Sequence, residues 1–201
     1  MKQIERDKMK KVILTDCDGV LMDWERCFSE WMIDNGYVVN SEFEYSYDMA
    51  AKYSISESEK RRLIKFFNES SRVGYLPPLR DAMKYVKKLH EENGYVFHMI
   101  TSLSLNPFSQ KLRIENTKRL FGETAFESFV FLDIGADKDE ALSKYKDSGL
   151  LWVEDKSENA VAGINQGLDS VLISHTFNED PFWNGGVPRY DTWKDLYEAI
   201  V

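Results

Sequence analysis

Two acidic residues stand two positions apart directly after a short apolar run. Asp16 and Asp18 follow residues 12–14, and Gly19 comes next. A continuous apolar run is typical of a strand buried on both faces, and a glycine lets the chain turn sharply after it. A carboxylate placed there can act as a nucleophile, and a second one can protonate a leaving group and then activate water. We therefore identify Asp16 and Asp18 as candidate catalytic residues, with helix caps or exposed loop acids as the plain alternative.

Three other residues have the chemistry to bind phosphate. Thr101 and Ser102 follow the apolar run 96–100, and their hydroxyl and backbone N–H groups can hold phosphate oxygens or cap the next helix. Lys138 begins a helical stretch, where an ammonium group can neutralise phosphate charge or simply lie in solvent. We take all three as candidate substrate-binding residues.

A second pair of acids closes another apolar run. Glu154 and Asp155 follow residues 150–153, and Glu158 comes three positions after Asp155. Paired carboxylates beside a strand end suit a hard, oxygen-liganded cation such as Mg²⁺. The same spacing also fits a helix capping box, and capping and metal binding can coexist. We expect a magnesium site that includes Glu154 and Asp155.

Five apolar runs alternate with helical patterns along the chain. The runs occupy residues 12–14, 96–100, 129–132, 150–153 and 171–173. The helical patterns occupy residues 79–92, 108–121, 138–146, 158–166 and 192–200. Strands that alternate with helices predict βαβ units, and therefore an α/β, Rossmann-like core with a parallel sheet flanked by helices. Because ligands of such sheets bind beyond the carboxyl ends of the strands, we expect the polar residues above to converge on one site.

One segment interrupts this alternation. Residues 22–76 separate the first two strands by far more than an ordinary crossover requires, and helical patterns cover residues 24–34 and 56–70. We predict that residues 22–76 form a small helical cap, inserted after the first strand. The predicted catalytic core then consists of residues 1–21 and 77–201.

The predicted cap is rich in aromatic residues. Stacking on an aromatic ring stabilises a bound nucleobase by about 1–3 kcal/mol. Trp24, Phe28 and Tyr45 are our candidates for residues at the mouth of the site, where they would contact the substrate. The alternative is that these rings form the small hydrophobic core of the cap itself.

The order of these residues along the chain is more specific than any one of them. It resembles the haloacid dehalogenase-like (HAD) hydrolase superfamily over nearly the whole chain outside the cap. Residues 16–20 are similar to its first motif, Thr101 to its second, Lys138 to its third, and residues 154–155 to its fourth. The second aspartate, Asp18, resembles that of the phosphatase and phosphotransferase branch.

A narrower resemblance is to the 5′(3′)-deoxyribonucleotidase family. The similar stretches are residues 16–24, 76–83, 136–138, 175–178, 187–189 and 193. One position departs from that family's pattern, because its fourth motif usually has two aspartates and this chain has Glu154 before Asp155. Glu-Asp pairs occur in other branches, including sugar-phosphate mutases and phosphatases.

The resemblance implies a Mg²⁺-dependent phosphomonoesterase that forms an aspartyl-phosphate, with a nucleoside or deoxynucleoside monophosphate as its small phosphorylated substrate. Asp16 would be the nucleophile, and Asp18 would be the general acid and then the base. Thr101 and Ser102 would bind phosphate oxygens, while Lys138 would offset their charge. The implied magnesium ligands are Asp16, Asp18 through its backbone carbonyl, Glu154 and Asp155.

Three alternatives stay open. The first is a sugar-phosphate or other small-metabolite phosphatase, or a phosphomutase, on the same fold. The second is a polynucleotide phosphatase. The third belongs to another class and is a regulatory protein that binds a phosphorylated ligand without turnover.

The composition of the 201-residue chain excludes several classes of protein. Hydrophobic residues make up 43% and charged residues 30%, as in a globular protein rather than a collagen-like or disordered one. The formal net charge of −8 argues against general nucleic-acid binding through a basic face. No apolar run approaches the roughly 20 residues that span a bilayer, and the charged N-terminus is unlike a secretory signal, so we expect a cytoplasmic protein. A homodimer is compatible with the sequence.

Overall fold

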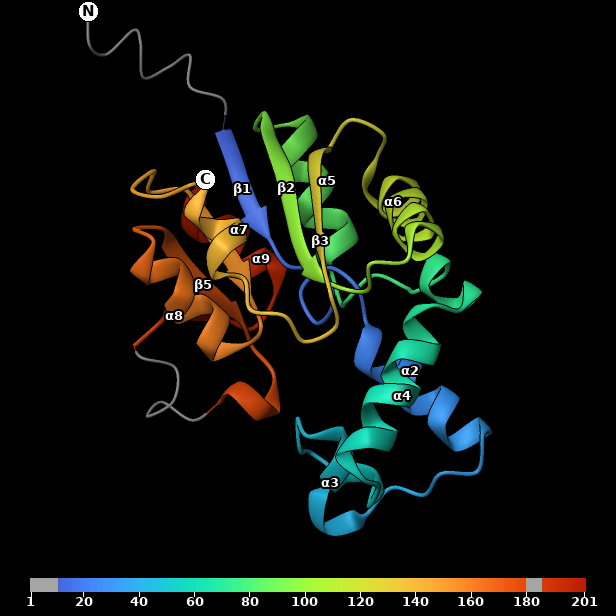
Figure 1. Cartoon of the computed structure of the whole chain (residues 1–201). Helices are drawn as coiled ribbons and strands as arrows, with labels where there is room; N and C mark the ends of the chain where they lie inside the picture. The colour runs from blue at the N-terminus through green and yellow to red at the C-terminus, as the bar shows by residue number, and fades with distance from the viewer. Residues whose placement is uncertain (1–10, 180–185) are drawn as a thin grey trace, which may run out of the picture.

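The computed structural model describes residues 11–179 and 186–201, so residues 1–10 of the predicted core lie outside the described part. Within that part, six strands form one sheet in the order β3-β2-β1-β4-β5-β6, and every neighbouring pair is parallel (Figure 1). The strands are β1 (Lys11–Thr15), β2 (Tyr95–Ser102), β3 (Phe126–Leu132), β4 (Leu151–Glu154), β5 (Asp169–Ile173) and β6 (Arg189–Tyr190). The predicted α/β fold is confirmed, and its strand order is that of a Rossmann-like fold.

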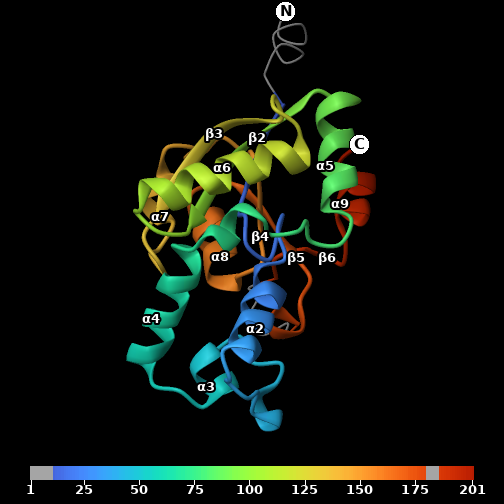
Figure 2. The ribbon, with the colours of Figure 1, turned by 90° about the vertical axis from the view of Figure 1, so that its right-hand side faces the viewer.

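Helices cover both faces of this sheet (Figures 1 and 2). Successive strand residues point to opposite faces, so the neighbours Ile13 and Leu14 belong to different hydrophobic clusters. Both side chains are fully buried, which is why the strand is an unbroken apolar run. The helices on the face of Ile13 are α5 (Ala82–Glu91), α6 (Pro107–Phe121) and α9 (Trp193–Ile200). Those on the face of Leu14 are α7 (Asp139–Ser143) and α8 (Ser157–Asn165).

The segment between β1 and α5 forms a group of helices beyond the carboxyl edge of the sheet (Figures 1 and 2). Its elements are α2 (Trp24–Asp34), α3 (Met49–Tyr53) and α4 (Glu57–Asn68), with the 3₁₀ turns η1 (Ser41–Phe43) and η2 (Ser71–Gly74). The observed bounds of α2 are the predicted ones. At the start of α4, the Ser56 hydroxyl accepts the Glu59 N–H at 3.2 Å. We call residues 22–76 the insertion, and its standing as a separate cap domain stays a prediction.

The insertion has an aromatic core. The ring centroid of Phe28 lies 5.3 Å from that of Phe67 and 5.8 Å from that of Trp31. Trp24 stacks on Phe28 at 4.7 Å. Such ring pairs add to the stabilisation that hydrophobic burial provides. The core therefore holds α2 against α4 next to the edge of the sheet where the strands end.

Helix α3 and strand β6 were not predicted from the sequence. Helix α3 has five residues and strand β6 has two, and both are shorter than the window in which periodicity can be recognised. A 3₁₀ turn, η3 (Thr176–Asn178), follows β5. Among the described residues, no helix combines the length and the apolar character that crossing a membrane requires.

Candidate active site

The carboxyl ends of β1, β2 and β4 bring the predicted residues together. Strand β1 lies between the other two, with Thr15 opposite Met99 on one side and Val153 on the other. The residues that follow these positions therefore share one edge of the sheet. A cavity of about 730 Å³ opens there. The predicted residues that line it are Asp16, Asp18, Trp24, Thr101, Ser102, Lys138 and Asp155.

Gly19 allows the loop after β1 to lie against the end of β4. Its φ is +73°, a conformation that glycine adopts readily and other residues rarely do. A Cβ atom at this position would lie 2.0 Å from Oδ2 of Asp155, so any larger residue would displace that carboxylate. The glycine after the two aspartates is thus a steric requirement for placing Asp16 and Asp18 beside Asp155.

Three residues near the C-terminus anchor the same loops. Nε2 of His175 donates to the Gly19 carbonyl at 2.6 Å, and Nε1 of Trp193 donates to the carbonyl of the next residue at 2.8 Å. The side-chain amide of Asn178 donates to the Asp155 carbonyl at 2.7 Å. All three belong to the C-terminal stretches that carry the narrower resemblance, and their observed role is to fix the backbone around the acids.

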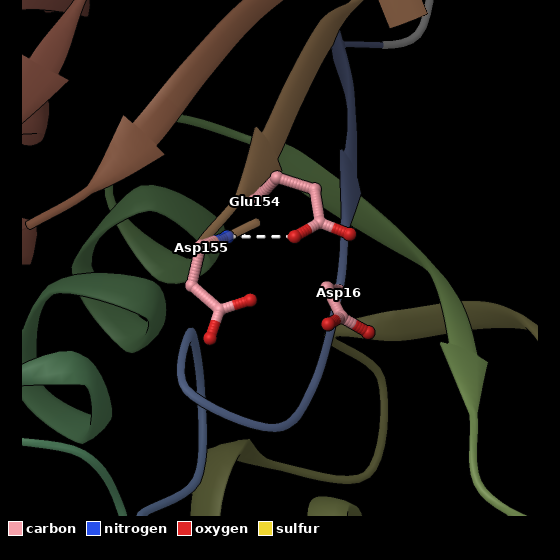
Figure 3. A group of neighbouring side chains, drawn as sticks. All are labelled: Asp16, Glu154 and Asp155. Carbon is pink, nitrogen blue, oxygen red and sulfur yellow. Dashed lines mark hydrogen bonds between the residues drawn. The ribbon is translucent and has the colours of Figure 1, made fainter. Parts of the chain in front are cut away.

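Three buried carboxylates face a common space (Figure 3). Oxygen atoms of Asp16, Glu154 and Asp155 all lie within 4.8 Å of one another. Nζ of Lys138 lies 2.9 Å from Oδ1 of Asp16 and 2.5 Å from Oε1 of Glu154, and the lysine side chain is 2% exposed. Lys138 therefore links the acid that follows β1 to the acid that ends β4.

Other groups of the protein donate hydrogen bonds to both oxygens of the Glu154 carboxylate. Besides the Lys138 contact, it accepts from the Asn159 side chain at 2.8 Å and from the backbone N–H groups of Asp155 and Lys156 at 2.7 and 2.8 Å. Burial acts to raise the pKa of Glu154, but the Lys138 charge and these hydrogen bonds outweigh burial and lower that pKa. Glu154 therefore stays ionised and holds both Lys138 and the turn after β4.

At Asp16 and Asp155 burial outweighs the compensation that Lys138 gives. Burial raises the pKa of Asp16 to about 7, with Glu154 and Asp18 adding to the rise and Lys138 opposing it. Burial, followed by the charges of Glu154 and Asp16, raises the pKa of Asp155 well above its usual range. Additional positive charge in the common space would be needed to keep both groups ionised at neutral pH.

A divalent cation fits this cluster. Asp16, Glu154 and Asp155 together can carry more negative charge than Lys138 balances, and buried charge without a partner is costly. Oδ1 of Asp16 shares the Lys138 ammonium group with Glu154, so one positive charge serves both carboxylates. Oxygen atoms are the ligands that Mg²⁺ prefers. The donor set therefore suits the predicted magnesium site, with Asp16 and Asp155 facing the common space.

The other predicted substrate-binding residues fall into two groups. Thr101, Ser102 and Trp24 line the cavity. Phe28 and Tyr45 do not line it within the described chain. Phe28 is 1% exposed because it lies on the face of α2 that packs against α4, and Tyr45 is 71% exposed because its side chain lies in solvent. The expectation that Phe28 and Tyr45 stand at the mouth of the site is corrected accordingly.

An aromatic row at the cavity was missed by the sequence patterns. It consists of Tyr47 from the insertion and of Phe177 and His175 from the segment after β5. The Phe177 ring lies 4.8 Å from Tyr47 and is stacked on His175 at 5.0 Å, and all three residues line the cavity. The sequence shows little sign of these residues. Tyr47 lies in no segment with helix or strand periodicity, and His175 and Phe177 were noted only in a stretch that resembles the deoxyribonucleotidase family.

Arg113, on the buried face of α6, also escaped prediction. Its guanidinium group pairs with the Asp18 carboxylate, and Nη1 lies 2.8 Å from Sγ of Cys17. Charged helix residues are mostly exposed, so the sequence alone gives no sign of this burial. Burial raises the pKa of the Cys17 thiol to about 12, which keeps it protonated and unsuited to nucleophilic attack.

Solved structures of other proteins share this arrangement of strands and helices. A HAD-like family hydrolase from Streptococcus pneumoniae matches with a TM-score of 0.68 at 13% identity, over 95% of this chain and 98% of that one. This chain has the haloacid dehalogenase-like fold. A HAD family hydrolase from Deinococcus radiodurans R1 with bound phosphate and sodium matches with a TM-score of 0.63 at 14% identity, over 94% of both chains. The D,D-heptose bisphosphate phosphatase of B. bronchiseptica, complexed with magnesium and phosphate, matches with a TM-score of 0.59 at 11% identity, over 94% of this chain and 97% of that one.

Sequence comparison finds fewer relatives of this chain than structure comparison does. No family model matches the chain. An uncharacterized 32.4 kDa protein in the Gp30-rIII intergenic region of Enterobacteria phage T4 is 26% identical over 144 residues. The match covers 69% of this chain and 51% of the phage protein, so the chain spans about half the length of this curated relative. At these identities the likeness to solved structures shows the fold, and one fold serves many activities.

Proposed function

We propose that this protein is a Mg²⁺-dependent phosphomonoesterase that forms an aspartyl-phosphate on Asp16. One observation carries the proposal: Asp16, Asp18, Thr101, Lys138 and Asp155 line a single cavity at the carboxyl edge of the sheet. This set combines a nucleophile, an acid–base group, phosphate ligands and a cation site. Each of these parts is needed for hydrolysis of a phosphate monoester, which is extremely slow without a catalyst.

The two aspartates divide the chemistry between them. A carboxylate oxygen of Asp16 attacks phosphorus, and the bond from phosphorus to the leaving oxygen breaks as Asp18 gives that oxygen its proton. Asp18, now a carboxylate, then takes a proton from water as the water oxygen attacks phosphorus. This second attack breaks the bond between phosphorus and Asp16, releases phosphate, and restores both aspartates to their starting forms.

Charge compensation decides whether Asp16 can approach a phosphate. Two unit charges about 4 Å apart repel by about 4 kcal/mol at an effective dielectric constant of about 20, and a phosphate dianion roughly doubles this. Lys138, 2.9 Å from Asp16, supplies one compensating charge. Asp16, Asp155 and the backbone carbonyl of Asp18 would hold Mg²⁺, with Glu154 acting on it indirectly. When bound, Mg²⁺ supplies further positive charge to the phosphate oxygens.

A nucleoside or deoxynucleoside monophosphate is the substrate we propose. Trp24, Tyr47 and Phe177 all line the cavity. Aromatic rings stabilise a stacked base by about 1–3 kcal/mol each. Their positions on both the insertion and the core would let them enclose the base once the phosphate group has reached Asp16.

The lysines of the insertion support an uncharged leaving group. Nζ of Lys52 lies 2.8 Å from Glu25, and Nζ of Lys60 lies 2.9 Å from Asp48. Both lysines line the cavity, yet each is already paired with an acid. A nucleoside, which brings no second phosphate, does not require either of these two lysines to be free.

A sugar-phosphate phosphatase is the second candidate. Ser29 lines the cavity, and its buried hydroxyl has no hydrogen-bond partner among the described residues. A sugar hydroxyl would pair with it. A polynucleotide substrate is disfavoured by the net charge of −8, since nucleic-acid binding draws on basic side chains. A cytoplasmic location and a homodimer stay predictions.

Phosphate release from a panel of phosphomonoesters tests the proposal. The panel holds ribo- and deoxyribonucleotides with 5′ or 3′ phosphates, sugar phosphates and an aryl phosphate, each assayed with Mg²⁺ and with a chelator. Asp16→Asn is the test variant, and Asp169→Asn, an exposed aspartate at the start of β5, is its matched control. We expect a preference for nucleotides, and loss of release both with the chelator and in Asp16→Asn.

Other outcomes of this assay separate the alternatives. Preference for sugar phosphates, with the same two losses, supports the second candidate. Absence of release by the folded protein in Mg²⁺ overturns the enzymatic proposal and favours a protein that binds a phosphorylated ligand without turnover.

A further inference from the structure

We propose that Arg113 is a positioning residue that orients the Asp18 carboxylate to take a proton from water. The inference rests on the proposed function, because it requires Asp18 to act as the base in the second step. Arg113 lies on α6, outside all four sequence motifs. Within the described chain it does not line the cavity, so any effect it has on the reaction passes through Asp18.

The guanidinium group of Arg113 contacts both oxygens of Asp18. Nη1 contacts Oδ1, and Nη2 lies 3.3 Å from Oδ2. The Arg113 side chain is 0% exposed and that of Asp18 is 22% exposed, so the pair extends from the core to the cavity wall. A two-point contact between a planar guanidinium and a carboxylate fixes the rotation of the carboxylate as well as its position.

The surroundings of Arg113 give no second reason for a charge at this place. Nη1 also lies 2.8 Å from Sγ of Cys17 and 3.8 Å from Sδ of Met22, and both sulfur atoms are only weakly polar. Among the described residues, Nε of Arg113 has no hydrogen-bond partner. A buried ion pair is costly to desolvate, and apolar residues of similar volume often serve stability equally well. Contact with Asp18 therefore accounts for the arginine better than packing does.

The backbone around Asp18 is already fixed by other contacts. The N–H groups of Leu21 and Met22 donate to the Cys17 carbonyl at 2.8 and 2.9 Å, and His175 holds the Gly19 carbonyl. The side-chain torsions of Asp18 are the freedom that remains. Arg113 restricts them, and it does so against the repulsion of the neighbouring carboxylate cluster.

The two chemical steps need a positioned Asp18 to different degrees. When Asp16 attacks p-nitrophenyl phosphate, the bond from phosphorus to the phenolic oxygen breaks and nitrophenolate leaves with the electron pair, so no proton is needed. Hydrolysis of the aspartyl-phosphate requires removal of a proton from water, which needs Asp18 as base. Loss of Arg113 is therefore expected to slow the second step and to spare the first.

Pre-steady-state release of nitrophenolate in Mg²⁺ tests the inference. The variants are Arg113→Met, Arg113→Lys and the control Arg119→Met, which makes the same change at an exposed position of α6. For Arg113→Met we expect an initial burst close to the wild-type rate, followed by turnover about 100-fold slower. Arg113→Lys keeps a charge that meets one oxygen at a time, so we expect a partial rescue with a loss of about tenfold. Arg119→Met is expected to match the wild type in both phases.

Two results overturn the inference. One is turnover by folded Arg113→Met within about threefold of the wild type, since an unpositioned base is expected to cost far more. The other is loss of the burst in the same proportion as turnover, because this indicates a general structural defect. If Arg113→Met does not fold, Arg113→Lys provides the test. A larger loss in turnover than in the burst rate then supports the inference, and equal losses overturn it. A wild type that releases no nitrophenolate overturns the proposed function itself, which is a distinct result.

Discussion

Replacing Asp16 by asparagine is expected to stabilise the metal-free protein in a pH-dependent way. The Asp16 side chain is buried, and burial, aided by Glu154 and Asp18 and opposed by Lys138, raises its pKa from 3.8 to about 7. A carboxyl whose pKa is higher in the folded state binds its proton more tightly there than in the unfolded state. Ionisation of Asp16 therefore opposes folding.

The shift sets both the pH window and the size of the effect. Below pH 3.8 Asp16 is protonated in both the folded and the unfolded state, and its ionisation does not change the free energy of unfolding. Between pH 3.8 and about 7 the free energy of unfolding falls as the pH rises. Above about pH 7 the full cost of ionising Asp16 in the folded state is present. At about 1.36 kcal/mol per pKa unit, the full cost is about 4 kcal/mol. Asparagine has nearly the same shape and no charge. We expect Asp16→Asn to exceed the wild-type free energy of unfolding by about 2–4 kcal/mol at about pH 8.5, and to match it at about pH 4.

Urea unfolding in the presence of a chelator measures this difference. Both proteins are compared at the two pH values, with Asp169→Asn as the control, for which we expect a change within about 0.5 kcal/mol at both. Equal free energies of unfolding for Asp16→Asn and wild type at the higher pH would contradict an uncompensated charge on Asp16. That result would mean that the protein alone compensates the Asp16 charge and that the site has no electrostatic need for a cation.

Three further substitutions test other parts of the site. Gly19→Ala places a Cβ atom 2.0 Å from Oδ2 of Asp155, so we expect the rise in melting temperature on adding Mg²⁺ to be lost; an unchanged rise contradicts the placement of the cation. Lys138→Met removes the charge 2.9 Å from Asp16, so we expect phosphate release to fall about 100-fold or more; a loss under about tenfold contradicts its role. Cys17→Ala removes a thiol whose pKa is about 12, so we expect near wild-type phosphate release; a large loss in a folded variant would assign the thiol a part in the reaction.

The strands of the sheet and the residues at their ends could be predicted because both depend on local sequence. Strands buried on both faces leave uninterrupted apolar runs such as residues 171–173, and polar residues that follow such strands must lie at the sheet edge. The convergence of Asp16, Thr101 and Asp155 on one cavity follows from this rule. Helix α2 was predicted with its observed bounds because its apolar positions recur with helical spacing.

The contacts that tertiary packing creates could not be predicted in the same way. Arg113 is buried because the fold brings Asp18, 95 positions earlier, to the inner face of α6. Tyr47 meets Phe177 only because the insertion lies beside the segment after β5. Phe28 was misplaced for a related reason, since helical spacing shows that a ring has a preferred face but not whether that face meets a cavity or a neighbouring helix.

Trapping the phosphorylated protein shows directly whether Asp16 accepts the phosphoryl group. The protein is mixed with a radiolabelled phosphomonoester in Mg²⁺, quenched in acid during the first turnover, digested, and mapped by peptide. We expect a label on the peptide that contains Asp16, removable by hydroxylamine as expected of an acyl phosphate, and absent from Asp16→Asn. Label on a different residue, or turnover in which no label ever reaches the protein, would contradict this expectation.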